Sequence, residues 1–108
     1  LRYFESFPNM NFQYDLRVMP FIQSLVSAGK LDDAKKHLRI LATETADMMN
    51  FYNSLSAEEL KSSFQQEKAY ANSSVREIIL RSSEFQDPEF EKEMKELLSK
   101  YDLAPVNN

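Results

Sequence analysis

A single glycine, Gly29, separates two segments whose apolar residues recur at helical spacing, and this arrangement constrains the fold more than any other feature. The first segment covers about residues 15–28, with Pro20 best tolerated in the first helical turn. The second covers about residues 32–55. Its apolar face is predicted to be buried and comprises Leu31, Ala34, Leu38, Leu41, Thr45, Met48, Tyr52 and Leu55. A glycine directly after a helix adopts the left-handed conformation at little cost, so we expect a helical hairpin with a tight turn.

Two further helices are predicted beyond the hairpin. Ser56 and Glu59 form the pattern of a capping box, which predicts a third helix over about residues 57–85. The stretch 71–74 has weak helix propensity, so a kink there is the alternative to a continuous helix. Asp87 as the cap and Pro88 in the first position predict a fourth helix ending near Tyr101.

The predicted fold class is therefore all-α, with about four helices in a bundle or a short right-handed array. No stretch has the two-residue period of a strand. We expect one helical domain over residues 14–102, followed by a flexible tail at 103–108. Residues 1–13 contain four aromatic side chains without a clear period and are expected to form an arm: Tyr3, Phe4, Phe7 and Phe12. Either their rings pack on the bundle, or the arm continues an element of a longer protein.

Charge and composition exclude several classes of partner. The net charge is −4 in 108 residues, without a basic stripe, which disfavours nucleic-acid binding. No apolar run approaches the ~20 residues that span a bilayer, so we expect no membrane insertion by this segment. The first residue is leucine rather than methionine, from which we expect a processed protein or a piece of a longer one.

The sequence offers little material for catalysis, and we expect no catalytic, metal-binding or cofactor-binding residues. One glycine cannot build a phosphate loop, and cysteine is absent. His37 is the only histidine, whereas a zinc site needs three or four ligands, so a solvated histidine is expected. Carboxylates gather at predicted helix starts, where the helix dipole accounts for them without catalysis: Asp32, Asp33, Glu58, Glu59, Glu89, Glu91, Glu93 and Glu96. Charged residues off the apolar face of the second helix, including Lys35 and Arg39, are expected to be solvated.

The hairpin resembles a tetratricopeptide unit. Relative to Gly29, that motif places a small residue seven positions before, a large apolar residue two after and alanine five after, and Ile22, Leu31 and Ala34 stand there. Ala34 fits best, because a small residue lets the two helices cross closely. Ile22 and Leu41 depart from the small residues of the motif. Gly29 and Ala34 are thus predicted as the turn and packing residues of one imperfect repeat.

A second resemblance covers more of the chain. The runs Tyr14–Phe21, Ala28–Lys30 with Ala34, and Asn50–Leu55 are similar to the C-terminal region of bacterial multi-spanning membrane proteins that resemble protein O-mannosyltransferases. The resemblance implies a non-catalytic accessory or interaction domain of a larger glycosyltransferase-like membrane protein. It also implies a place on the extracytoplasmic face of a bacterial inner membrane, with the cytoplasmic side as the alternative. The partner would be another protein or the membrane-embedded part of the same chain.

Other functions remain open at this stage. A stand-alone helical-repeat adaptor would bind a peptide or protein on the concave face of the first helix, at Met19, Gln23 and Ser27. A homodimer through residues 48–52 is a further alternative, because exposed apolar faces find partners. A small enzyme would need a pocket that joins His37 to a carboxylate.

Overall fold

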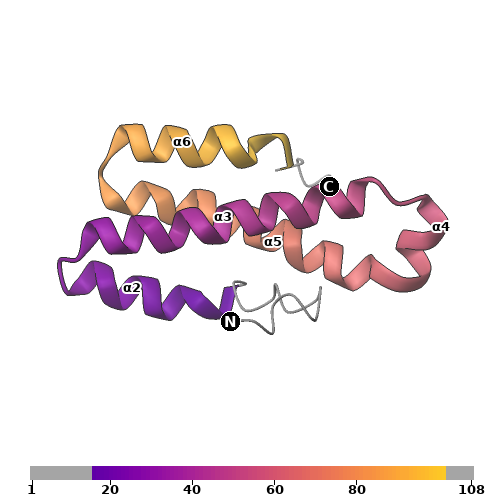
Figure 1. The fold of residues 1–108 in the computed structure, drawn as a ribbon, viewed down its shortest axis with the longest axis horizontal. Coiled ribbons are helices and arrows are strands. Elements are labelled where there is room, and N and C mark those ends of the chain that lie inside the picture. Colours follow the sequence, from indigo (N-terminus) through magenta and orange to yellow (C-terminus); the bar gives the residue numbers. More distant parts are fainter. Residues whose placement is uncertain (1–15, 102–108) are drawn as a thin grey trace.

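The computed structural model describes residues 16–101, and these form an all-α bundle of four helices without strands (Figure 1). The predicted fold class is therefore confirmed. The predicted arm at 1–13, the expected cap Asp15 and the predicted tail at 103–108 lie outside the described residues.

The first two helices form the predicted hairpin. The 3₁₀ turn η2 (Leu16–Val18) leads into α2 (Met19–Ser27). Pro20 lies in the first turn of α2, where a backbone N–H would have no acceptor within the helix, so its missing N–H costs no hydrogen bond. At the other end, Lys30 N–H donates to Leu25 O at 2.9 Å and Gly29 N–H donates to Val26 O at 3.0 Å. This is the Schellman pattern, and Gly29 takes the left-handed φ of 78° that it requires.

The hairpin continues into α3 (Leu31–Asn53), which packs against every other long helix. Ala34, the predicted packing residue, lies in the first turn of α3 and is fully buried. Leu31, expected on the buried face, is 39% exposed. It is the first residue of α3 and lies beside the turn, where less of α2 covers it.

The third predicted helix is interrupted, although not where its propensity is weakest. It consists of α4 (Ala57–Glu59), the π-helical segment η3 (Leu60–Phe64), α5 (Gln65–Ser82) and the 3₁₀ turn η4 (Ser83–Phe85). The capping box is confirmed, because Glu59 N–H donates to Ser56 Oγ and Ser56 N–H donates to Glu59 Oε1. The stretch 71–74 is regular helix, since Ala71 and Ser74 are buried there and packing outweighs propensity.

The fourth helix is α6 (Pro88–Leu98), followed by the 3₁₀ turn η5 (Ser99–Tyr101). It packs against both α3 and α5, whereas α2 packs mainly on α3 (Figure 1). At its end, Tyr101 Oη donates to Asn50 Oδ1 at 2.5 Å and ties η5 to α3. The largest fully enclosed apolar side chains come from all four helices: Ile22, Leu38, Leu41, Met49, Val75, Ile78, Met94 and Leu98.

Candidate binding surface

The outer face of α2 is a shallow, exposed depression. It is lined by Pro20, Gln23, Ser24, Ser27 and Ala28, which recur three and four residues apart on one side of the helix. Ser24 Oγ donates to Pro20 O at 3.0 Å, so one hydroxyl of the face is held by its own helix. Small side chains flank Gln23, which allows a partner backbone to approach α2 closely. We name this set of five residues the α2 face.

Two of the three residues predicted to bind a partner lie on the α2 face. Gln23 and Ser27 are exposed one turn apart. The expectation that Met19 is presented beside them is wrong, because Met19 is only 6% exposed. Met19 precedes the buried Ile22 by three residues, so both side chains point into the core, and Pro20 takes the outward position instead.

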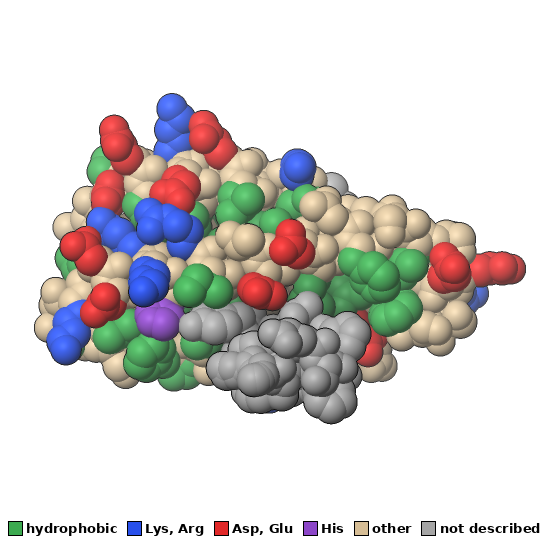
Figure 2. All heavy atoms as spheres, viewed as in Figure 1, with side chains coloured by type: hydrophobic (Ala, Val, Ile, Leu, Met, Phe, Trp, Pro, Cys, Tyr) green, Lys and Arg blue, Asp and Glu red, His purple; other side chains and the backbone are tan. Residues whose placement is uncertain are grey.

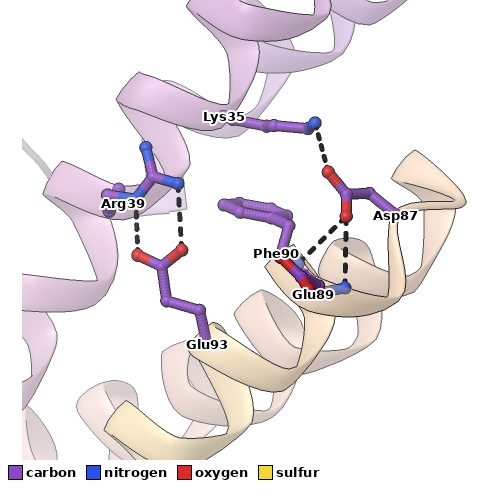
Figure 3. A network of polar contacts seen from close by, with 6 residues as sticks. All are labelled: Lys35, Arg39, Asp87, Glu89, Phe90 and Glu93. Atoms are coloured by element: carbon purple, nitrogen blue, oxygen red, sulfur yellow. Dashed lines mark hydrogen bonds and ion pairs between the residues drawn. The ribbon is translucent and has the colours of Figure 1, made fainter.

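A network of charged side chains connects α3 with the start of α6 (Figure 3). Lys35 Nζ donates to Asp87 Oδ2 at 2.5 Å. Arg39 donates twice to Glu93, from Nε at 2.5 Å and from a terminal nitrogen at 2.9 Å. Charged side chains of both signs crowd this end of the molecule in Figure 2. The expectation of a solvated side chain is wrong for Lys35, whose side chain is 19% exposed. The Arg39 side chain is 47% exposed, as expected, and only its acidic partner more than 50 positions away was not predicted.

Phe90 lies between the two ion pairs and is 2% exposed. Lys35 Nζ is 5.8 Å and the Arg39 guanidinium carbon is 5.3 Å from the centre of its ring, distances at which a cation is attracted to the ring face. On its other side the ring contacts Phe85 edge-to-face at 5.0 Å. Lys35 and Arg39 thus each interact both with a carboxylate and with the ring of Phe90 on α6.

The pKa values of both carboxylates follow from these contacts. The hydrogen bond from Lys35 lowers the pKa of Asp87, and the backbone N–H of Phe90 lowers it further. The bidentate hydrogen bonds from Arg39 lower the pKa of Glu93. Both carboxylates are held ionised and paired. They are therefore better suited to holding α6 on α3 than to transferring protons. The helix dipole alone therefore does not account for the acidic residues at the start of α6. The sequence did not indicate that Lys35 and Arg39 of α3 face these residues.

His37 is half-buried, and its ring contacts Phe21 edge-to-face with 5.1 Å between centroids. The prediction of a solvated histidine is therefore only partly right, because neighbouring side chains cover part of the ring. Within residues 16–101, no group of three or more His, Asp or Glu side chains is arranged to hold a metal ion.

Comparisons with known proteins give no relative: no family model matches the chain, and no match was found among the curated proteins or the solved structures. None of the helices between residues 16 and 101 combines the length and apolarity needed to cross a bilayer.

Proposed function

We propose that this chain is a non-catalytic interaction domain of a larger membrane protein of the glycosyltransferase-like type, and that the α2 face contacts its partner. The observation that carries the proposal is the exposure of Gln23 and Ser27 together, on an edge helix whose opposite side is committed to α3. An edge helix can receive another element without rearrangement of the core. The imperfect tetratricopeptide register and the resemblance of residues 14–55 to the tails of such membrane proteins support the same proposal.

The proposed parent protein makes a direct prediction about the gene. The reading frame upstream of the codon for Leu1 should encode many apolar segments of about 20 residues. The domain would then lie on the extracytoplasmic face of the membrane. A full-length reading frame without such segments would overturn this part of the proposal and favour the stand-alone adaptor.

The α2 face is tested by a photo-crosslinking residue placed at Gln23 in the full-length protein in its native cell. We expect a crosslink to the membrane-embedded part of the same chain, mapped by mass spectrometry. The matched control carries the same residue at Gln66, which is exposed on α5. A crosslink from Gln23 to a separate protein favours the adaptor, and equal background products at both positions would contradict any role for the α2 face.

The two polar side chains can be tested in the same system. The double variant Gln23→Ala/Ser27→Ala should weaken the contact at least tenfold while thermal unfolding stays unchanged, because both side chains are exposed. Gln66→Ala/Ser73→Ala changes the same residue types on exposed positions of α5 and should leave the contact intact.

A further inference from the structure

The connection between η4 and α6 is short and strained. Two residues, Gln86 and Asp87, reverse the direction of the chain. Gln86 has φ 54° and ψ 39°, the left-handed region that residues with a side chain rarely adopt. Its N–H donates to Ser83 O at 3.4 Å, which is long for a hydrogen bond and offsets little of the strain. Because the side chain of Gln86 is exposed, its packing does not compensate for this conformation either.

The helix that follows this connection lies at one edge of the bundle (Figure 1). On one side of α6, Phe90, Met94 and Leu98 are buried, and α6 packs on α3 and α5. On the opposite side the side chains of Lys92 and Glu96 are 75% and 68% exposed. An edge helix can leave its groove without passing through another element, so the connection at Gln86 is what keeps α6 on its own chain.

The contacts that hold α6 and η5 on α3 do not depend on this connection. The side-chain hydrogen bonds between them each join residues more than 50 positions apart: Lys35 with Asp87, Arg39 with Glu93, and Asn50 with Tyr101. The α6 of a second copy presents the same side chains in the same order, so it can make every one of these contacts in the same groove. Only the backbone at Gln86 differs between the two arrangements.

Pro88 confines the change of backbone to Gln86. Proline disfavours the helical conformation in the residue before it, and Asp87 is extended, with φ −129° and ψ 97°. Asp87 therefore keeps its conformation and its cap of α6 in both arrangements. If Gln86 moves to an ordinary negative φ, its strain is relieved and α6 no longer folds back onto its own α5. The helix is then free to dock on another copy.

We propose that two copies of this chain exchange α6 and η5 across Gln86 and so form a two-fold dimer. The exchanged dimer keeps the contacts of the single chain and relieves the strain at both hinges. It is opposed by the freedom lost on association, so its share rises with the concentration of the chain.

This dimer differs from the one considered through residues 48–52, of which Met49 and Tyr52 are buried in the core. It also leaves the α2 face untouched, since α2 packs mainly on α3. The inference is therefore independent of the proposed function and would stand if the α2 face bound nothing.

Two substitutions at Gln86 should shift the ratio of dimer to monomer in opposite directions. Each chain is refolded from urea at millimolar concentration, the order of the effective concentration of a tethered element, and its mass is measured by light scattering after size-exclusion chromatography. We expect a dimer of the original chain. Gln86→Gly removes the strain and should lower the ratio by about fivefold or more, whereas the β-branched Gln86→Val should raise it. Monomer alone in all three chains, or one ratio for all three, would overturn the proposal.

A mixing experiment identifies the exchanged element. The chain has no cysteine, so Arg39→Cys in one chain and Glu93→Cys in another each introduce a single thiol. These two positions face each other across α3 and α6 (Figure 3). After joint refolding, a short bismaleimide should join the two chains, and mass spectrometry should find a peptide that links positions 39 and 93. Without exchange, each chain carries only one of the two thiols at its own groove and this peptide does not form.

The matched control pairs the Arg39→Cys chain with Lys92→Cys, because Lys92 lies on the exposed side of α6. It should give no linked peptide. Linkage at position 92 as strong as at position 93 would identify a dimer through the outer side of α6, and linkage at neither position would exclude exchange; both results overturn the proposal. The variants of Gln86 need no thiol and decide the question independently if either cysteine variant fails to fold.

Discussion

Two residues between positions 16 and 101 adopt a left-handed backbone, and only one of them is the residue type that suits it. Gly29 has φ 78° at the end of α2, and Gln86 has φ 54° at the end of η4. Each ends a helix and lets the chain reverse within a few residues. A residue with a side chain is sterically strained in this region, whereas glycine is not. The left-handed conformation is therefore strained at Gln86 and unstrained at Gly29.

Gly29→Ala should lower the free energy of unfolding by about 1 kcal/mol. A Cβ at Gly29 would meet nothing within 4 Å, so the loss comes from the left-handed φ and not from a clash. Urea unfolding followed by circular dichroism measures the difference. Gly29→Asn should lose less, because asparagine tolerates this conformation better, and Gln86→Gly should raise stability slightly. A Gly29→Ala variant as stable as the original chain would contradict this account of the turn.

At the scale of elements, predictions from local pattern succeeded where the contacts are local. The glycine turn, the capping box at Ser56 and the Asp87–Pro88 start of α6 each depend on residues within one helical turn, and each is confirmed. The interruption of the third helix depends on packing between helices. Burial of Ala71 and Ser74 keeps the weak stretch helical. The π-helical segment falls at 60–64 instead, and its three central residues, 61–63, are exposed. Residue propensity could not have placed it.

Asp87 combines two duties within one carboxylate, and two variants separate them. Oδ1 accepts the backbone N–H groups of Glu89 and Phe90, and Oδ2 accepts Lys35. Asp87→Asn should keep the cap and lose the ion pair, whereas Asp87→Ala should lose both. We expect the melting temperature to fall by about 5 °C in Asp87→Ala and by clearly less in Asp87→Asn.

Lys35→Met provides the complementary control for Asp87, since it removes only the ion pair and keeps the apolar stem of the side chain. Its loss should match that of Asp87→Asn. Equal losses in Asp87→Asn and Asp87→Ala would show that the cap contributes nothing.

At the scale of the whole molecule, the sequence predicted the class of fold but not the partners of its charged residues. The apolar stripes predicted four packed helices because the position of an apolar face can be derived from the residues of each helix alone. The pairs Lys35–Asp87 and Arg39–Glu93 depend on how α6 lies across α3, and no local spacing encodes that. The prediction for Met19 was wrong for a different reason: Met19 precedes Ile22 by three residues, so helical spacing places both on the buried side of α2.

The two ion pairs between α3 and α6 should make the fold sensitive to acid. The pKa values of Asp87 and Glu93 are lowered in the folded state from ordinary values of 3.8 and 4.5. Their stabilising contribution is therefore fully present above those ordinary values and is lost as the pH falls through the lower folded-state values. Glu44 has the opposite sign: burial, reinforced by the charge of Asp47, raises its pKa, so its protonation favours the fold on acidification.

Unfolding by urea at pH 7, 5, 4 and 3 compares the original chain with Glu93→Gln. The original chain should lose more stability than the variant between pH 5 and 3, because only the original has this carboxylate to protonate. At pH 7 the variant should be less stable by at most about 1 kcal/mol, the scale of a surface ion pair. Glu91→Gln is the matched control on α6, since its carboxylate pairs within the helix with Lys95 and not with α3. Parallel pH curves for the original chain and Glu93→Gln would show that the Arg39–Glu93 pair does not contribute to holding α6 on α3.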